Sequence, residues 1–250
     1  MTTEQRKLAP KIALGVGAGD AIGAAFARRF AKAGYGIAVA RRDGDKSAEL
    51  VREIEAGGGV ARAFSVDARS PEAIDALFET VEAEMGSVEV CLYNAGANFR
   101  APLAETTPEM FEKVWRLGCL AGFLTGQAAA RRMAPRGSGS ILFTGATASM
   151  RGGANFAAFA AAKFGLRAVA QSMARELGPQ GIHVAHLVID GGVDSPAIHA
   201  RRKAAGHSGE FPPDSLMNLA SIGEAFYTLA SQSRDAWTFE MDIRPFMEPW

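Results

Sequence analysis

The chain has 250 residues, of which 48% are hydrophobic, and its 27 basic and 27 acidic residues give a formal net charge of zero. This length and apolar content allow one large α/β domain or two small ones, with a core that folds without disulfides or metals. The lack of a basic excess argues against a nucleic-acid partner, and no apolar run is long enough to span a bilayer.

After residues 1–10, which are expected to form a flexible tail, the predicted elements alternate between strand and helix. Short apolar runs predict seven strands, at residues 11–16, 36–40, 60–66, 88–93, 140–144, 182–189 and 237–243. Helical patterns predict helices at residues 21–33, 45–56, 71–85, 108–133, 156–177 and 214–231. Ser70-Pro71-Glu72 and Thr107-Pro108-Glu109 are typical helix starts, with a capping hydroxyl followed by proline.

This alternation predicts a single α/β domain over residues 1–250, built on a doubly wound parallel sheet of about seven strands with helices on both faces. Most of the strands are apolar almost throughout, as expected of strands covered on both faces. The tail lacks the apolar core of a signal peptide. Cys91 and Cys119 fit no disulfide or metal spacing, and His183 and His186 fall on opposite faces of one strand. We therefore expect a cytoplasmic protein without a metal.

A glycine-rich turn connects the first strand to the first helix. It reads Gly15-Val16-Gly17-Ala18-Gly19-Asp20-Ala21-Ile22-Gly23, and glycines there let the backbone approach a pyrophosphate at the helix N-terminus. The general Gly-x-Gly-x-x-Gly spacing is not met, because Ile22 takes the third position. A tight structural connection is the alternative, but the strand–turn–helix context favours a dinucleotide.

Arg41-Arg42 ends the second strand, where NAD-binding folds usually carry an acid that bonds the ribose 2′-hydroxyl. Arginine pairs with a 2′-phosphate, which an acid would repel. Two solvated surface arginines are the alternative, and Asp20 in the glycine turn counts against a nearby phosphate. The residues favour NADP(H) as the cofactor, with NAD(H) as the alternative.

Taken in order, the motifs resemble the short-chain dehydrogenase/reductase family over nearly the whole chain. The matching segments are the glycine turn, Asp67 after the third strand, Tyr93-Asn94-Ala95-Gly96, and Asp190-Gly191-Gly192-Val193-Asp194-Ser195, where aspartate replaces the family's proline. The resemblance implies a set of cofactor-binding residues: Gly17, Gly19, Ile22, Gly23, Arg41, Arg42, Asp67, Asn94, Ala95, Gly96, Lys163, Val193 and Ser195. It also implies that residues 190–213 form the substrate-loop region.

The catalytic positions depart from the family's pattern. The family uses a tyrosine as acid/base, a lysine one helical turn later, a serine that binds the substrate oxygen and an asparagine that supports a proton-relay water. Here Lys163 is present, but Phe159, Ala146 and Gly118 occupy the tyrosine, serine and asparagine positions. The groups considered as substitutes are Tyr93, Thr144, Thr147, Ser149, Asn155 and Lys163 itself. For each hydroxyl, a purely structural role in the loop is the alternative.

This pattern favours an NAD(P)-dependent oxidoreductase that moves hydride to or from a small carbonyl, alcohol or activated double bond, with a non-standard proton donor. A catalytically silent NADP(H)-binding protein, acting as a sensor or partner subunit, is the alternative. Retention of Asp67, Asn94 and Lys163 beside the lost catalytic groups favours continued cofactor use. The helices at 108–133 and 156–177 are apolar over much of their circumference. Together with the resemblance, this implies a homodimer or homotetramer that acts on a small molecule.

Overall fold

The computed structural model describes residues 11–206 and 209–249, so the predicted tail at 1–10 lies outside the described residues. A parallel seven-stranded sheet has the strand order β3-β2-β1-β4-β5-β6-β7. The strands are β1 (Ile12–Val16), β2 (Gly36–Arg41), β3 (Ala61–Ser65), β4 (Val88–Tyr93), β5 (Gly139–Thr144), β6 (Ile182–Ile189) and β7 (Glu240–Ile243). The order reverses between β1 and β4, and a doubly wound sheet places its ligand crevice at such a reversal. The predicted fold class is confirmed.

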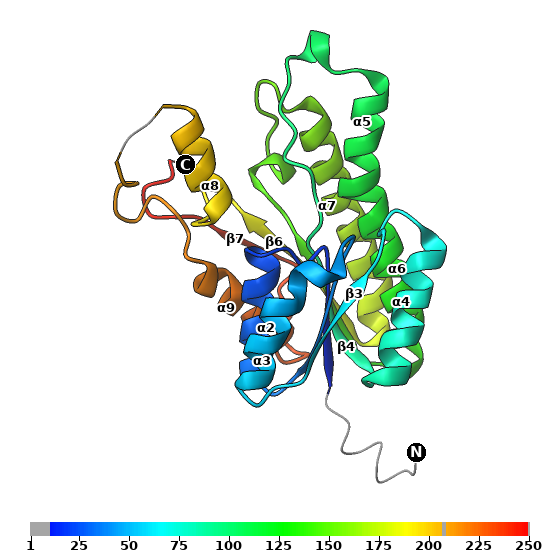
Figure 1. Cartoon of the computed structure of the whole chain (residues 1–250). Helices are drawn as coiled ribbons and strands as arrows, with labels where there is room; N and C mark the ends of the chain where they lie inside the picture. The colour runs from blue at the N-terminus through cyan, green and yellow to red at the C-terminus, as the bar shows by residue number, and fades with distance from the viewer. Residues whose placement is uncertain (1–10, 207–208, 250) are drawn as a thin grey trace.

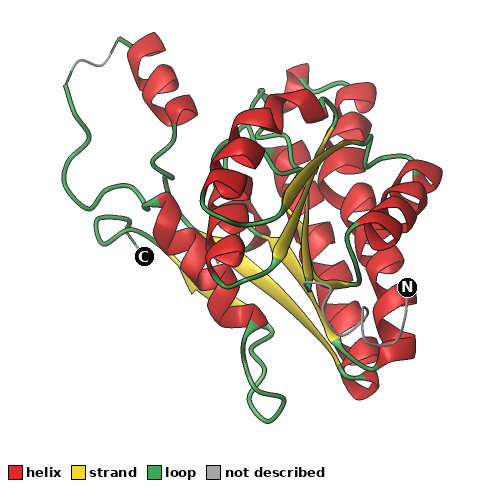
Figure 2. Cartoon of the chain, turned by 60° about the horizontal axis from the view of Figure 1, so that its bottom comes forward, coloured by secondary structure: helices red, strands yellow, loops and turns green. Residues whose placement is uncertain are grey.

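Two layers of helices cover the sheet (Figure 1), and Figure 2 shows the strands in yellow between helices in red. One layer holds α2 (Ile22–Lys32), α3 (Ala48–Ala56) and α9 (Leu219–Ala230). The other holds α4 (Pro71–Glu84), α5 (Pro108–Trp115), α6 (Ala121–Met133) and α7 (Ala157–Leu177). A further helix, α8 (Pro196–Ala204), stands apart from both layers.

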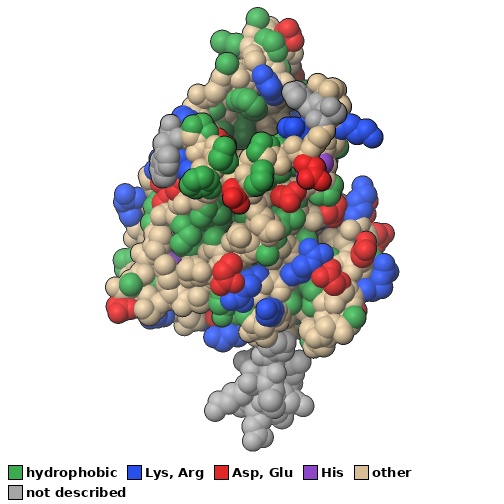
Figure 3. Space-filling model, turned by 90° about the vertical axis from the view of Figure 1, so that its left-hand side faces the viewer, with side chains coloured by type: hydrophobic (Ala, Val, Ile, Leu, Met, Phe, Trp, Pro, Cys, Tyr) green, Lys and Arg blue, Asp and Glu red, His purple; other side chains and the backbone are tan. Residues whose placement is uncertain are grey.

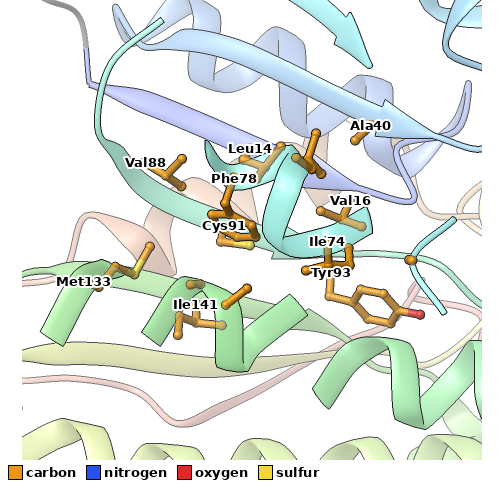
Figure 4. Close-up of a cluster of buried hydrophobic side chains, with 14 of the residues drawn as sticks. Leu14, Val16, Ala40, Ile74, Phe78, Val88, Cys91, Tyr93, Met133 and Ile141 are labelled. Atoms are coloured by element: carbon orange, nitrogen blue, oxygen red, sulfur yellow. The ribbon is translucent and has the colours of Figure 1, made fainter. Parts of the chain in front are cut away.

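Each face of the sheet has its own buried apolar cluster, because successive strand residues point to opposite faces. Leu14 and Cys91 belong to the cluster under α4, α6 and α7, whereas Ala13 and Val90 belong to the cluster under α2, α3 and α9. Figure 4 shows part of the first cluster, in which Tyr93 lies among the buried side chains. The strands are therefore held from both sides, as their continuous apolar sequences predict.

The two predicted helix starts are confirmed in detail. The Ser70 hydroxyl accepts a hydrogen bond of 3.1 Å from the backbone N–H of Ala73, and the Thr107 hydroxyl accepts one of 3.2 Å from Met110. The single helix predicted over residues 108–133 is interrupted, because residues Arg116–Leu120 form a π-helical turn between α5 and α6. The apolar pattern predicted helix on both sides of this turn and did not distinguish a π-helical turn from an α-helical one.

Three expectations for the last quarter of the chain need correction. The final helix begins at Leu219 and not near residue 214, because Asn218 caps it with a 2.7 Å hydrogen bond from Ala220 N–H and Asp214 has a left-handed φ of 58°. No helix was predicted within the expected substrate-loop region at 190–213, but that region contains α8, which starts with Pro196 at its first position. The last strand begins at Glu240 rather than at residue 237.

Candidate functional site

Two adjoining cavities open at the carboxyl ends of the central strands. The smaller, of about 330 Å³, lies by the ends of β2 and β3, and the larger, of about 630 Å³, lies between the β5–α7 loop and the end of β6. Both are lined by Gly17, Gly19, Asn94 and Gly96, which follow β1 and β4. Figure 3 shows hydrophobic side chains gathered in the upper half of one face of the molecule. The crevice thus lies at the reversal of strand order, where the fold predicts it.

The glycine turn is packed against the segment after β4. Gly17 has a left-handed φ of 75°, and a Cβ added there would lie 2.4 Å from the backbone nitrogen of Ala95. The Asn94 amide fixes the same contact, since its Nδ2 donates a 3.1 Å hydrogen bond to the Gly17 carbonyl. A Cβ on Gly19, in contrast, would meet nothing within 4 Å. Gly17 is therefore required by the fold, and Gly19 leaves space toward the cavities.

The start of α2 presents unpaired backbone donors to the larger cavity. Ala21 is the N-cap and supplies no side-chain hydrogen bond. The backbone N–H groups of Asp20, Ala21 and Ile22, which line this cavity, have no acceptor within the described part of the chain. Unpaired amides at a helix N-terminus are a ready site for an anion such as a diphosphate. Gly23 lines neither cavity, and its missing Cβ lets α2 pack on Ala18.

Charged side chains line the smaller cavity. The Arg41 guanidinium donates a 2.6 Å hydrogen bond to Asp20, whereas Arg42 has no carboxylate partner within 4.0 Å among the described residues. The acid of the glycine turn, Asp20, is therefore paired with Arg41. Asp67 accepts hydrogen bonds from the Arg69 side chain at 2.6 and 2.9 Å, and this partner lowers the pKa of the Asp67 carboxyl to about 2. Arg42 is thus the cation here that is most available to a phosphate.

Lys163 lies at the wall of the larger cavity and is only 5% exposed. Its Nζ donates a 2.7 Å hydrogen bond to the backbone carbonyl of Thr144, and the Thr144 hydroxyl donates one of 2.9 Å to Asn94 Oδ1. Burial lowers the pKa of the Lys163 ammonium to about 8. A chain of hydrogen bonds therefore joins α7, β5, the end of β4 and the glycine turn.

The positions of the missing catalytic groups are apolar. Phe159 and Ala146 line the larger cavity together with Lys163. Gly118 lies in the π-helical turn and lines neither cavity; a Cβ added there would come within 2.7 Å of the Ala162 Cβ. An asparagine side chain would therefore need the turn and α7 to separate.

Tyr93 does not reach the site, which excludes it as a substitute for the missing tyrosine. Its side chain is fully buried, its hydroxyl donates to the Leu117 carbonyl, and burial raises the pKa of the phenol. Ser149 is fully buried too, and its hydroxyl accepts a 3.1 Å hydrogen bond from the Ala146 N–H. Asn155 has a left-handed φ of 68° and lines neither cavity. Tyr93 ends the apolar run of β4, and the elements packed on the strand decide which way its side chain points.

Arg151 was not among the residues expected in the site, and Asp190 was expected only as a departure from the family's pattern. Asp190 is fully buried at the end of β6, and its carboxylate accepts hydrogen bonds from Arg151 at 3.0 and 3.2 Å and from Thr147 at 2.5 Å. Burial favours the neutral acid, but these donors outweigh it and hold the pKa of the Asp190 carboxyl below its usual range. A buried acid needs hydrogen-bond donors. An aspartate directly after the apolar run of β6 was therefore the sequence signal that a cluster of donors lies nearby.

The remaining predicted residues take different places. Ala95 lines the smaller cavity, and Val193 lines the larger one and pairs with Met217. Ser195 lines neither cavity and stands at the N-cap of α8. His186 is buried, with its Nδ1 2.9 Å from Glu240 Oε2. Within residues 11–206 and 209–249, no group of three or more His, Cys, Asp or Glu side chains is placed to hold a metal. No helix of those segments is long and apolar enough to cross a membrane.

Comparison with known proteins gives a consistent set of relatives. The profile of the short chain dehydrogenases matches residues 11–206. The 3-oxoacyl-[acyl-carrier-protein] reductase MabA of Mycobacterium avium is 32% identical over 203 residues, which cover 80% of this chain and 79% of MabA. The crystal structure of a short-chain dehydrogenase from Rhodopseudomonas palustris is 47% identical, with a TM-score of 0.81 over 94% of this chain and 99% of that one. A metagenomic short-chain oxidoreductase, solved in complex with NADP, is 26% identical, with a TM-score of 0.81 over 96% and 99% of the two chains.

Proposed function

The chain belongs to the short chain dehydrogenase family, and from that membership we propose that it is an NADP(H)-dependent oxidoreductase acting on a small carbonyl, alcohol or activated double bond. The observation that carries the proposal is the buried Lys163, whose only hydrogen bond among the described residues goes to a neutral carbonyl. A buried ammonium without a carboxylate partner costs free energy, so its place beside the cavity favours a role in the site.

The residues of the crevice suit the two phosphate-bearing parts of NADP(H), which are the diphosphate and the 2′-phosphate. The unpaired amides of Asp20, Ala21 and Ile22 suit a diphosphate, and Arg42, with Arg41 beside it, suits a 2′-phosphate. The complex of the metagenomic relative with NADP supports the same cofactor here. When bound, the cofactor supplies or accepts the hydride. Lys163, Asn94 and Val193 are then the residues expected to hold its nicotinamide half.

We assign the proton donor to Lys163, because Phe159 and Ala146 offer no exchangeable proton. An ammonium with a pKa of about 8 is charged at neutral pH yet gives up its proton readily, as a general acid requires. In the reducing direction Lys163 gives this proton to the substrate atom on which negative charge develops. The resulting neutral amine regains a proton from solvent. In the oxidising direction the same amine accepts the proton.

Cofactor titration tests the proposal directly. NADPH should bind the wild-type protein at least about tenfold more tightly than NADH, as expected when a charge-assisted hydrogen bond is lost. Replacement of Arg42 by alanine should remove that preference, and Arg41→Asp should do the same by placing an acid beside the phosphate. The matched control is Arg52→Ala, an exposed arginine on α3 that lines neither cavity. Equal affinity for the two cofactors in the wild type would refute the NADP(H) assignment.

We also propose that the protein forms a homodimer or homotetramer through α5, α6 and α7. Four large aromatic side chains on these helices are between 37% and 41% exposed: Phe111, Trp115, Phe123 and Phe164. Large exposed apolar groups on neighbouring helices are typical of an interface. Sedimentation velocity should report an assembly for the wild type and a smaller species for Phe164→Glu. The cytoplasmic location expected from the sequence stays a prediction.

A further inference from the structure

Arg151 is a charged side chain of the larger cavity that the proposed chemistry leaves without a task. It lies in the loop between β5 and α7, lines the cavity, and its side chain is 50% exposed. Asp190, its ion-pair partner, is fully buried. The acidic member of the pair therefore lies in the protein interior, and the basic member lies at the surface of the cavity. This arrangement presents a fixed cation toward the space that a substrate would occupy.

The guanidinium keeps hydrogen-bonding capacity for a ligand. It has five N–H donors, and Nη1 and Nη2 each donate one bond to Asp190, at 3.0 and 3.2 Å. Its side chain makes no other hydrogen bond within the described residues. Three donors therefore stay available on a group that its partner already holds in place. A preorganised arginine loses little side-chain freedom when it binds a second anion.

A cluster of charged side chains surrounds the carboxylate of Asp190. Asp190 is shared between two arginines, because Arg244 Nη2 also lies 3.0 Å from its carboxylate. Thr147 completes the set with its 2.5 Å hydrogen bond. Arg244 also pairs with Asp242 at 2.8 Å, so two arginines and two carboxylates meet here, and what Arg151 offers a ligand is its free N–H donors at the cavity wall. Asp190 does not line the cavity and Arg151 does, so the guanidinium is the charge nearer to an anion there.

The rest of the lining defines what such an anion must be attached to. Its wall away from the glycine turn is largely apolar, with Ala146, Ala148, Phe156, Phe159, Ile189 and Val193. The cations on this lining are Arg151 and Lys163, and the acid on it is Asp20, which Arg41 pairs at 2.6 Å. Lys163 is the proposed proton donor and Val193 is expected to hold the nicotinamide, so the wall left to a substrate is Ala146, Ala148, Phe156 and Phe159 with Arg151 as its cation. A ligand that matches this part of the wall has an apolar body and one anionic group.

We propose that Arg151 binds the carboxylate of an apolar carboxylic acid substrate that carries the reducible carbonyl or double bond, with Asp190 and Thr147 as positioning residues. This inference rests on the proposed function, because it names the substrate class of the same site. Arginine meets a carboxylate through paired, charge-assisted hydrogen bonds, so it discriminates an acid from its neutral amide.

Binding of octanoate and octanamide, two ligands that differ in charge at one end, tests the inference. Titration calorimetry with and without saturating NADP⁺ should show octanoate binding about tenfold or more tightly than octanamide, as a charge-assisted hydrogen bond predicts. Arg151→Gln should abolish this preference while leaving NADPH affinity unchanged. The control is Arg100→Gln, since Arg100 lies over the Phe156 ring at 5.6 Å but does not line the cavity. Equal binding of the two ligands by the wild type, or a preference that survives in Arg151→Gln, would overturn the inference.

A test of Asp190 as a positioning residue must measure a property that a general destabilisation of the fold would not change selectively. Measured well below its melting temperature, Asp190→Asn should weaken octanoate binding and leave octanamide and NADPH affinities unchanged. Loss of all three affinities together would show that Asp190 supports the fold and not Arg151. NADPH affinity is recorded separately throughout. A protein that prefers octanoate but binds no NADPH would therefore disprove the oxidoreductase proposal and keep the carboxylate site.

Discussion

The ammonium of Lys163 donates a 2.7 Å hydrogen bond to the backbone carbonyl of Thr144. This contact fixes a buried cation of α7 at the end of β5, and the Thr144 hydroxyl continues the connection to Asn94 at 2.9 Å. The charge has no carboxylate within 4.0 Å in the segments that the structure describes, so burial alone decides its titration. Two predictions follow from this relationship.

The first concerns the pH dependence of reduction. Burial lowers the pKa of Lys163 to about 8, and the proposed proton donor is the charged form. The turnover number for NADPH-dependent reduction should therefore fall as the pH rises through about 8. Lys163→Arg, which stays protonated at every accessible pH, should lose this limb of the profile. A turnover number that is unchanged between pH 7 and pH 9.5 in the wild type would exclude Lys163 as the donor.

The second concerns stability. The folded-state pKa of Lys163 is below its unfolded value of 10.5, so between about pH 8 and pH 10.5 the unfolded chain binds more protons at this site. By linkage, the lysine's contribution to the free energy of unfolding becomes more favourable as the pH rises through that range and is constant below it. Lys163→Met should thus be more stable than the wild type at pH 7, with a smaller advantage at pH 10. Urea denaturation of both proteins at the two pH values measures this difference, and an equal difference at both would contradict it.

Restoring the missing hydroxyls should add a second proton donor. Phe159 and Ala146 line the same cavity as Lys163, so Phe159→Tyr with Ala146→Ser places both groups at that wall. A positioned acid typically contributes about 10²–10⁴ in rate. The double variant should reduce carbonyl compounds at least about a hundredfold faster than the wild type in an NADPH oxidation assay. Cofactor affinity is the control and should not change, and an unchanged rate would show that the site does not use a proton donor at these positions.

The two glycines of the turn should separate folding from binding. A Cβ on Gly17 would lie 2.4 Å from the Ala95 nitrogen, and Gly17 also has a positive φ, so Gly17→Ala should lower both the melting temperature and NADPH affinity. A Cβ on Gly19 meets no protein atom within 4 Å, so Gly19→Ala should keep the wild-type melting temperature and lose NADPH affinity. Differential scanning calorimetry and fluorescence titration measure the two properties. Unchanged NADPH affinity in Gly19→Ala would place the diphosphate elsewhere.

The strands of the fold were predictable because each is a local apolar run. The bounds expected for β4 and β6 agree with those observed, at Val88–Tyr93 and Ile182–Ile189. The π-helical turn at Arg116–Leu120 was not predicted, and its close packing, with a Cβ on Gly118 falling 2.7 Å from the Ala162 Cβ on α7, involves a residue 44 positions away in the chain. Helix α8 was missed for a related reason, since the segment around it has little apolar periodicity.

The sequence by itself determined the strands, the glycine turn and the arginines after β2, because each consists of residues that are close together in the chain. Only the tertiary structure decided where the side chains of distant segments meet. It turned Tyr93 into the core, paired Arg41 with Asp20, and joined Arg151 to a buried Asp190. The physical reason is that burial and electrostatic pairing depend on distances between elements, and these distances are set when the helices pack on the sheet.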